Sequence, residues 1–292
     1  MCDLLLQHVP GEFCTYVELF CGGGAFFYRL HDEGRLRRFA WPPRDPKNRV
    51  LLEDTDDAGL DRARGPSAFL CDGNVELMTT YKVVRDDPEG LLDALLTFYR
   101  TAAGRISPFY GWLRDRMEPA NDVETAARML FLNKHCFNGL YRVNADGRFN
   151  VPFAADSENR RPDPAKILAS SQALQRVQLH PGYFLDGVIA GIPRRGDLVY
   201  ADPPYDGTFD QYVSKKTMPF SDAERVHLRD HLTRFVENGV HVILSEADTP
   251  RVRELYSKRP FVLHTVETTQ TVSCTAEGRK KRADLIVVGK LR

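Results

Sequence analysis

Short apolar runs alternate with amphipathic stretches in two separated parts of the chain. In the first part, an apolar run breaks at Gly22, Gly23 and Gly24 before a helix start, and a second run ends in Asp72. In the second part, the β-branched runs typical of buried strands recur at 177–184, 197–205, 240–248 and 283–291. Strands that alternate with helices predict an α/β fold on a mostly parallel sheet.

A different pattern fills the middle of the chain. From 86 to 134 the periodicity is helical, and Asn121 followed three residues later by Glu124 predicts a helix start. The Asp146-Gly147 pair between "LYRVN" and "RFNVP" predicts a β-hairpin. We therefore predict a catalytic domain of residues 1–75 and 165–292, with a helical and hairpin subdomain, residues 76–164, inserted into it.

Other segments complete this prediction. A helix is expected from Pro164, and Ser221 with Glu224 predicts a capping box on a later helix that ends at Asn238-Gly239. The inward face of that later helix comprises Leu228, Leu232 and Phe235. Residues 31–67, dense in charge, Pro and Gly, predict a surface excursion with at most a short strand, "RVLLED".

Composition narrows the function classes. Lys+Arg and Asp+Glu are equal at 40 each, so nucleic-acid binding would require a local basic patch. The six cysteines form no Cys-x-x-Cys pair and lack clustered His partners, so we expect no metal site and buried thiols in a reducing compartment. No apolar run reaches the length of a membrane span, and the N-terminus lacks the pattern of a secretory signal. We expect a cytoplasmic protein with no membrane contact.

The glycine turn has two interpretations. Glycine allows a tight turn and a close backbone approach to a ligand, and the following helix start offers N–H groups. The turn has no third glycine at the spacing of a dinucleotide-binding fingerprint, and it is not followed by the Lys-Ser/Thr of a P-loop. A cofactor site and a mere tight turn therefore both stay open. Glu18 ends the preceding strand, where its acid could bind a cationic or amino group.

Asp72 repeats this arrangement at the end of the next strand. An acid at this edge of an α/β sheet commonly binds ribose hydroxyls. The alternatives are that Asp72 is a helix N-cap for the segment that begins at Asn74, or that Asp54 or Asp56 binds the ribose instead.

The tetrapeptide Asp202-Pro203-Pro204-Tyr205 follows an apolar strand. Two prolines remove two backbone donors and fix two φ angles, so the turn is rigid and its carbonyls point outward. The Asp carboxylate and a proline carbonyl can together accept hydrogen bonds from an exocyclic amine, and the tyrosine ring can stack on the base. The alternative is a rigid loop with a buried tyrosine.

In this order, the motifs resemble those of the DNA adenine methylase (Dam) family of S-adenosylmethionine-dependent enzymes. "YVELFCGGGAFF" is similar to its cofactor loop, "CDGNVEL" to its ribose-binding element and "LVYADPPY" to its catalytic motif. "LNKHCFNGLYRVNADGRFNVPF" resembles its target-recognition hairpin, "VILSEADT" a later strand and "TVSCTAEGRKKRADLIV" its C-terminal segment. The resemblance implies a Rossmann-like methyltransferase sheet with an inserted target-recognition subdomain.

The resemblance also implies roles for individual residues. The expected catalytic residues are Asp202, Pro203, Pro204 and Tyr205. The expected residues for S-adenosylmethionine are Glu18, Phe20, Cys21, Gly22, Gly24, Asp72, Phe184 and Asp202. The expected DNA-binding residues are Lys134, Phe137, Asn138, Leu140, Arg142, Asn144, Arg279 and Lys280. Among these, Phe137 and Asn138 would fill the gap left by a flipped base and Leu140 and Arg142 would read base edges, whereas Arg142 could instead contact phosphate. The basic run that holds Arg279 and Lys280 could instead be a solvated turn.

The chain departs from the family pattern at several positions. Members usually begin with a Lys-Trp-x-Gly-Gly-Lys segment that touches cofactor and DNA, and this sequence aligns just after it, so we expect reading of the outer base to change. Tyr183 stands where many members have Asp, and Glu246 where Asn is common. The residues after the hairpin lack the Gly-Arg-Tyr run with which family members contact phosphate, and we expect Arg160 and Arg161 to take its place.

The expected function is site-specific transfer of a methyl group to N6 of an adenine flipped out of duplex DNA, with GATC as the carried-over site. Cytosine-C5 methylation is excluded because no cysteine follows a proline. Cytosine-N4 methylation and a non-catalytic DNA-binding relative that lacks the N-terminal segment are the alternatives. The expected partners are double-stranded DNA and a cognate restriction endonuclease, with the protein a monomer or weak dimer.

Overall fold

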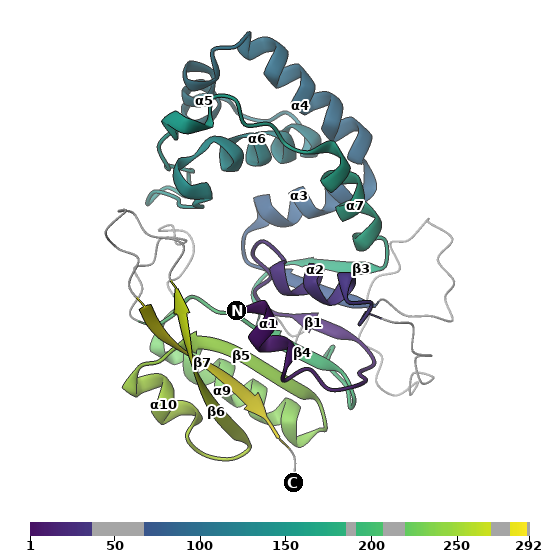
Figure 1. The fold of residues 1–292 in the computed structure, drawn as a ribbon, viewed down its shortest axis with the longest axis vertical. Coiled ribbons are helices and arrows are strands. Elements are labelled where there is room, and N and C mark those ends of the chain that lie inside the picture. The colour runs from purple at the N-terminus through teal and green to yellow at the C-terminus, as the bar shows by residue number, and fades with distance from the viewer. Residues whose placement is uncertain (37–66, 185–190, 207–219, 270–280, 291–292) are drawn as a thin grey trace.

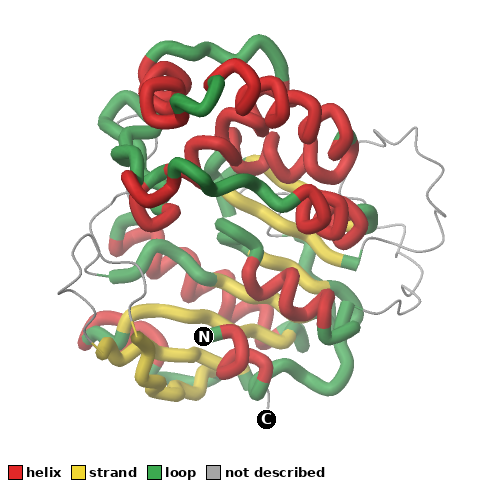
Figure 2. Tube along the Cα trace, turned by 45° about the horizontal axis from the view of Figure 1, so that its top comes forward, coloured by secondary structure: helices red, strands yellow, loops and turns green. Residues whose placement is uncertain are grey.

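The computed structural model describes residues 1–36, 67–184, 191–206, 220–269 and 281–290. The predicted strand "RVLLED", the rival acids Asp54 and Asp56, and the basic residues Arg279 and Lys280 lie outside these ranges. A twisted sheet with helices on both faces forms one part of the molecule, and a block of helices lies beyond one edge of it (Figures 1 and 2). This arrangement confirms the predicted α/β class.

Within the described residues, the sheet has seven strands in the order β3-β2-β1-β4-β5-β7-β6. Six of them run in the same direction, and β7 is antiparallel to both of its neighbours, β5 and β6. The strands are β1 (Tyr16–Glu18), β2 (Ala68–Asp72), β3 (Val177–Pro181), β4 (Leu198–Ala201), β5 (His241–Ala247), β6 (Phe261–Thr269) and β7 (Lys281–Gly289). The strand order reverses between β1 and β4, which is the point where α/β sheets bind ligands beyond their carboxyl ends.

Nearly continuous apolar strands bury both faces of this sheet. Tyr16 and Leu70 point to one face, where α1 (Cys2–Leu6), α2 (Ala25–Asp32) and α7 (Pro164–Leu174) contribute to the core. Val17 and Phe69 point to the other face, which is covered by α9 (Asp222–Glu237) and α10 (Pro250–Tyr256). The predicted inward residues Leu228, Leu232 and Phe235 are buried on this second face.

The helical block comprises α3 (Val75–Asp86), α4 (Pro88–Ala102), α5 (Ile106–Asp115) and α6 (Asp122–His135). Helix α3 contacts β2 and β3 and also packs against α6 and α4. A single apolar core therefore continues from one face of the sheet into the block. The block is built from the residues predicted as an insertion, and its boundary at residue 76 stays a prediction.

Two predicted helix starts are confirmed. The Asn121 side chain accepts a hydrogen bond from the Glu124 amide at 2.9 Å and caps α6. Ser221 and Glu224 form a reciprocal capping box on α9, and the helix ends at Asn238 before Gly239, whose φ of 83° suits glycine.

The predicted hairpin is present as a turn with two isolated bridges rather than as two regular strands. Val143 pairs with Phe149, and Cys136 pairs with Phe153. The Asn144 side-chain oxygen accepts from the amides of Asp146 and Arg148, both at 3.0 Å. Side chains thus bond to the backbone around the turn, and such local bonds compete with a regular ladder.

Candidate active site

The glycine turn lies at the end of β1, directly beside the end of β4. The Leu19 amide donates to the Tyr200 carbonyl at 3.0 Å, and the Cys21 amide donates to the Cys71 carbonyl at 2.9 Å. These bonds anchor the turn to both neighbouring strands. Gly22 and Gly24 then adopt φ values of 46° and 65°, and Gly24 caps α2. The turn therefore needs glycine for its backbone conformation.

Tyr81 of α3 supports this turn from the side. Its hydroxyl donates to the Gly22 carbonyl at 3.0 Å. A Cβ placed on Gly24 would lie 2.6 Å from the same hydroxyl oxygen. The contact joins residues 59 positions apart, so no local signal in the sequence indicates it.

Both carboxylate oxygens of Asp72 accept backbone hydrogen bonds, one from the glycine turn and one from the start of α3. Oδ2 accepts from the Gly22 amide at 2.9 Å, and Oδ1 accepts from the Asn74 amide at 2.8 Å. The side chain that caps α3 belongs to Asn74, which accepts from the Leu77 amide at 3.1 Å. The N-cap interpretation of Asp72 is therefore wrong. Burial raises the pKa of Asp72, and the two backbone donors oppose that rise.

Three acids stand at or just after the ends of the adjacent strands β2, β1 and β4. They are Asp72, Glu18 and Asp202. Burial raises the pKa of Glu18 well above its usual range, and the charges of Asp202 and Asp72 add to the rise. The Tyr16 hydroxyl donates to Glu18 at 2.9 Å and partly offsets it. A cationic ligand would relieve the mutual repulsion of these acids.

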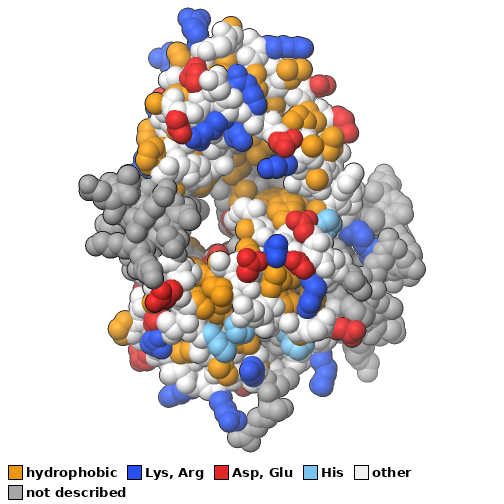
Figure 3. Space-filling model, in the orientation of Figure 1, with side chains coloured by type: hydrophobic (Ala, Val, Ile, Leu, Met, Phe, Trp, Pro, Cys, Tyr) orange, Lys and Arg blue, Asp and Glu red, His pale blue; other side chains and the backbone are white. Residues whose placement is uncertain are grey.

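Asp202 is exposed to solvent at the start of the turn formed by residues 202–205, here called the proline turn. Protein surrounds its carboxyl closely enough for burial to raise its pKa to about 6, yet the residue keeps solvent-accessible surface. Hydrogen bonds from Tyr205 and Ser245 favour the charged form and limit the rise. On the face that Figure 3 shows, the molecule is hollowed between the helical block and the sheet-bearing part, with hydrophobic side chains in the hollow.

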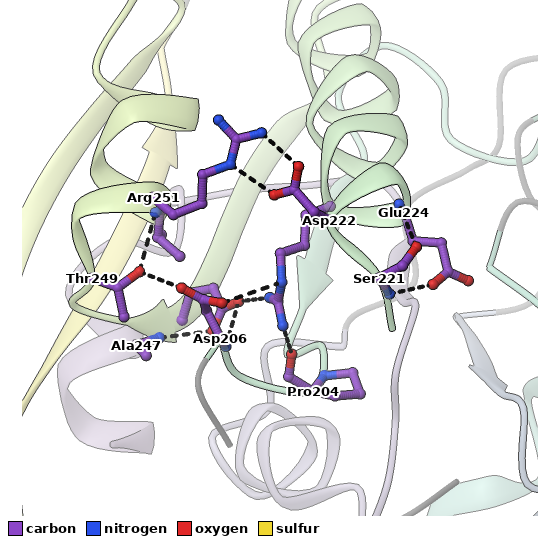
Figure 4. A network of polar contacts seen from close by, with 11 residues as sticks. Pro204, Asp206, Ser221, Asp222, Glu224, Ala247, Thr249 and Arg251 are labelled. Carbon is purple, nitrogen blue, oxygen red and sulfur yellow. Dashed lines mark hydrogen bonds and ion pairs between the residues drawn. The ribbon is translucent and has the colours of Figure 1, made fainter. Parts of the chain in front are cut away.

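The proline turn is held by hydrogen bonds to side chains of α9 and β5 (Figure 4). Arg225 Nη2 donates to the Pro204 carbonyl at 2.8 Å, and Arg225 Nη1 donates to Glu246. Glu246 accepts from the Asp206 amide, with N–O distances of 3.1 and 3.2 Å. Burial raises the pKa of Glu246, and the Arg225 guanidinium opposes the rise. Glu246 stands where the family commonly has Asn, whereas no signal in the sequence indicates Arg225.

Aromatic rings cluster beside the glycine turn. The Phe20 and Phe184 ring centroids are 4.8 Å apart, and Phe220 lies 5.6 Å from Phe20 and 5.7 Å from Phe184. Tyr183 packs on Phe184, and its hydroxyl donates to Glu224 of α9. Phe184 is only 4% exposed. The predicted packing of Phe184 on the cofactor adenine stays a prediction, because its ring here contacts other aromatic rings.

The expected DNA-binding residues that the structure describes fall into two groups. Lys134, Phe137, Asn138 and Leu140 lie at the end of α6 and in the next turn, where Phe137 and Asn138 are exposed. Arg142 instead binds Asn150 across the hairpin, through its side-chain oxygen at 2.7 Å and its carbonyl at 3.1 Å. Asn144 holds the hairpin turn. Phe137 and Asn138 are thus solvent-exposed, whereas Arg142 and Asn144 stabilise the hairpin, and the DNA-binding role of both groups stays a prediction.

No site role was predicted for Tyr141, which joins the hairpin to the start of α3, beside the proposed cofactor site. Its side chain hydrogen-bonds to Asn74, the residue that caps α3 just after Asp72. Burial raises its pKa to about 12, with Glu76 adding to the rise. No periodic signal could have indicated this contact, since it joins two loops across the fold.

Comparison with known proteins identifies the family of the chain. Residues 60–272 match the D12 class N6 adenine-specific DNA methyltransferases. The chain belongs to this family. Type II methyltransferase M1.LlaDCHI of Lactococcus lactis subsp. cremoris is 29% identical over 299 residues, which cover 97% of this chain and 90% of that protein. The retron Ec67 DNA adenine methylase of Escherichia coli is 29% identical over 230 residues, 78% of this chain and 77% of that protein. The DNA adenine methylase of Escherichia coli (strain K12) is 25% identical over 252 residues, 84% and 88% respectively.

As a D12-class enzyme, the protein uses S-adenosylmethionine as methyl donor and DNA as substrate. The acids around the glycine turn fit this cofactor, since it carries a sulfonium and an ammonium group and ribose hydroxyls. Family membership opposes the cytosine-N4 alternative. Among the described residues, no cluster of three or more His, Cys, Asp or Glu could hold a metal ion. Nor does any helix in the described ranges have the length and apolarity to cross a membrane.

Proposed function

We propose that this protein methylates N6 of an adenine flipped out of duplex DNA, within the sequence GATC. The observation that carries the proposal is the meeting of the Asp202-Pro203-Pro204-Tyr205 turn with the Gly22–Gly24 turn at the reversal of strand order. One turn suits an exocyclic amine, and the other suits a methyl donor. Their strands are hydrogen-bonded neighbours, so donor and acceptor would bind side by side.

The chemistry in this proposal is mostly positioning. Asp202 and the Pro203 carbonyl accept hydrogen bonds from the adenine amine, because the Pro204 carbonyl is bound to Arg225. The Tyr205 ring stacks on the base, and such stacking is worth about 1–3 kcal/mol per base. That offsets much of the few kcal/mol that flipping costs. S-adenosylmethionine supplies an electrophilic methyl group. The role of the protein is to hold the amine nitrogen in line with it.

The proposed cofactor residues surround the glycine turn. Asp72 would bind the ribose, Glu18 the cationic end, and Phe184 the adenine ring. Phe20, Cys21, Gly22 and Gly24 would form the wall of the site through the turn itself. The support is their position, since Asp72 and the turn are already joined by a 2.9 Å hydrogen bond.

Residues 76–164 would form the DNA-recognition part. Lys134, Phe137, Asn138 and Leu140 are its proposed contacts, with Phe137 filling the space of the flipped base. Asn138 has a φ of 54°, a conformation that is uncommon outside glycine and is often found at functional sites. On sequence grounds, we also propose that Arg279 and Lys280 contact phosphate.

Three further proposals concern the protein in the cell. They are a cognate restriction endonuclease as partner, a monomeric or weakly dimeric state, and a cytoplasmic location.

The test is transfer of labelled methyl from S-adenosylmethionine to unmethylated duplexes that contain GATC or a scrambled site. Labelled N6-methyladenine in GATC alone, and none with Asp202→Ala, supports both chemistry and site. Label in the scrambled duplex retains the chemistry and rejects GATC. Binding of cofactor without transfer to any duplex rejects the proposed activity and favours a non-catalytic relative.

A further inference from the structure

The proline turn has few ways to be held in place. Pro203 and Pro204 have no N–H group, so the turn can be tied to the fold only through its carbonyls, its side chains and the amides of Asp202, Tyr205 and Asp206. Two rigid φ angles fix the shape of the turn but not its orientation in the molecule. Its orientation must come from contacts with neighbouring elements.

A buried ion pair makes two of these contacts. Arg225 of α9 is 8% exposed, and Glu246 of β5 is 2% exposed. Arg225 donates to the Pro204 carbonyl at 2.8 Å, while Glu246 accepts from the Asp206 amide at 3.1 Å. The pair thus holds the turn at the Pro204 carbonyl and at the Asp206 amide, one on either side of Tyr205. Arg225 and Glu246 are also bonded to each other.

Neighbouring groups reinforce the pair. The Thr249 hydroxyl donates to the Asp206 carboxylate at 2.7 Å, and that carboxylate lies 3.9 Å from Arg225 Nε. The Arg225 guanidinium also stacks over Phe220 at 5.0 Å, and Phe220 belongs to the aromatic cluster beside the glycine turn. Arg225 therefore contacts the turn proposed to hold the methyl acceptor. Through Phe220 it also contacts the aromatic cluster beside the turn proposed to hold the methyl donor.

We infer that Arg225 and Glu246 are positioning residues for methyl transfer, which orient the Asp202–Tyr205 turn toward the donor without touching either substrate. The inference rests on the proposed function. Such a pair is a costly way to stabilise a protein, because removing charges from water often costs as much as their attraction returns. Orientation of a reacting group has a larger effect, since a displacement of about 1 Å can change a rate by roughly 100-fold.

The first measurement is independent of activity. Hydrogen exchange is followed in the peptide that covers residues 202–206, whose backbone amides are those of Asp202, Tyr205 and Asp206. Glu246→Gln and Arg225→Gln should each accelerate exchange in this peptide by roughly 10-fold or more. Arg251→Gln is the matched control, because Arg251 of α10 also pairs with a residue of α9, Asp222, but its side chain is 37% exposed and its hydrogen bonds go to Asp222 and Glu254, not to the turn (Figure 4).

The second measurement separates positioning from stability. Each single variant should lower kcat by about 10- to 100-fold, with KM for DNA and Kd for S-adenosylmethionine changed less than 3-fold. The double variant Arg225→Gln with Glu246→Gln leaves no buried charge unpaired, so it should recover much of the lost Tm. Its kcat should stay low, because the Arg225 donor to the Pro204 carbonyl is still missing.

The outcomes are distinct. Absence of methyl transfer by the wild-type protein rejects the proposed function, and the exchange data still decide whether the pair anchors the turn. Unchanged exchange in both single variants overturns the inference even in an active enzyme. Recovery of kcat in parallel with Tm in the double variant also overturns it, because the pair would then act only on stability.

Discussion

Asp72 and Gly22, which are 50 positions apart in the chain, are joined by a 2.9 Å hydrogen bond from the glycine amide to the carboxylate. The residue proposed to bind the cofactor ribose therefore also shapes the loop proposed to hold the rest of the cofactor. Asp72→Ala should weaken binding of S-adenosylmethionine by at least 10-fold. It should also lower the free energy of unfolding by about 1–3 kcal/mol, because two amides lose their acceptor. Calorimetric titration and urea unfolding measure the two effects.

A control separates this loss from a general effect of removing an acid. Asp115→Ala removes an exposed carboxylate that pairs with Arg114, far along the chain from the glycine turn. It should leave cofactor affinity unchanged. Equal losses in the two variants would show that Asp72 has no specific part in cofactor binding.

Gly24→Ala should destabilise the protein and weaken the cofactor site. A φ of 65° costs a residue with a Cβ roughly 1–2 kcal/mol, and the new Cβ would meet the Tyr81 hydroxyl at 2.6 Å. Gly22→Ala shares the positive φ but meets no atom within 4 Å, so it should cost less. Thermal unfolding compares the two. Adding Tyr81→Phe to Gly24→Ala should recover part of the loss, and no recovery would contradict the proposed clash.

Methyl transfer should require the charged form of Asp202. Burial raises the pKa of its carboxyl to about 6, so kcat should rise with pH through about 6 and then level off. The sign follows from its role as an acceptor of the amine hydrogens, which a protonated carboxyl fills poorly. The pH profile of kcat between 5 and 8 at saturating substrates tests this. A flat profile over that range would remove Asp202 from the rate-determining step.

His135 should make the protein less stable as the pH falls. It is fully buried, its Nδ1 lies 2.9 Å from the Ser157 carbonyl, and its Nε2 lies 2.9 Å from the Tyr99 hydroxyl. These partners suit a neutral ring that donates from Nδ1 and accepts at Nε2. Burial lowers its folded pKa to about 4, below the ordinary value of 6.5. The unfolded chain therefore binds more protons between pH 6.5 and 4, and the free energy of unfolding contributed by this group falls across that window.

Comparison with His135→Gln isolates that effect from the acids that titrate in the same range. Raised pKa values of about 6 at Asp197 and Asp202 act in the opposite direction and are common to both proteins. Urea unfolding at several pH values should give a stability difference between the two proteins that shrinks as the pH drops. A constant difference would mean that the ring is not held neutral.

Phe137→Ala should impair DNA handling with little effect on folding. The side chain is 38% exposed on the turn after α6, so its removal should change stability by less than about 1 kcal/mol. Flipping, followed by 2-aminopurine fluorescence at the target adenine, should fall several-fold. Leu168→Ala on α7 is the matched control, since Leu168 is also 38% exposed. Equal flipping by both variants and the wild-type protein would reject the filling role.

Local signals in the sequence were sufficient to predict the parallel strands and the acids at their ends. Glycine, proline and an acid at strand ends are recognisable because each imposes a local backbone constraint, and the topology then brings Glu18, Asp72 and Asp202 to one edge. Edge strand β6 was not predicted, because its alternating polar residues lack the continuous apolar run of the buried strands.

Contacts between distant segments were not predictable in this way. Arg225 is an ordinary-looking charge within a helix, and its role depends on the side-by-side packing of α9 and β5. The family resemblance implies that Arg142 contacts DNA, which stays a prediction, and it gave no sign of the hydrogen bond from Arg142 to Asn150. Partners of this kind depend on register and packing, which no periodicity encodes.

Helix α3 has a mechanical consequence for the whole enzyme. It begins just after Asp72, contacts β2 and β3, and packs along α6. A helix of 12 residues is about 18 Å long and resists sharp bending, because a kink breaks backbone hydrogen bonds. The proposed methyl-donor site and the base of the proposed DNA-recognition block therefore lie on one helix, which fixes the distance between them.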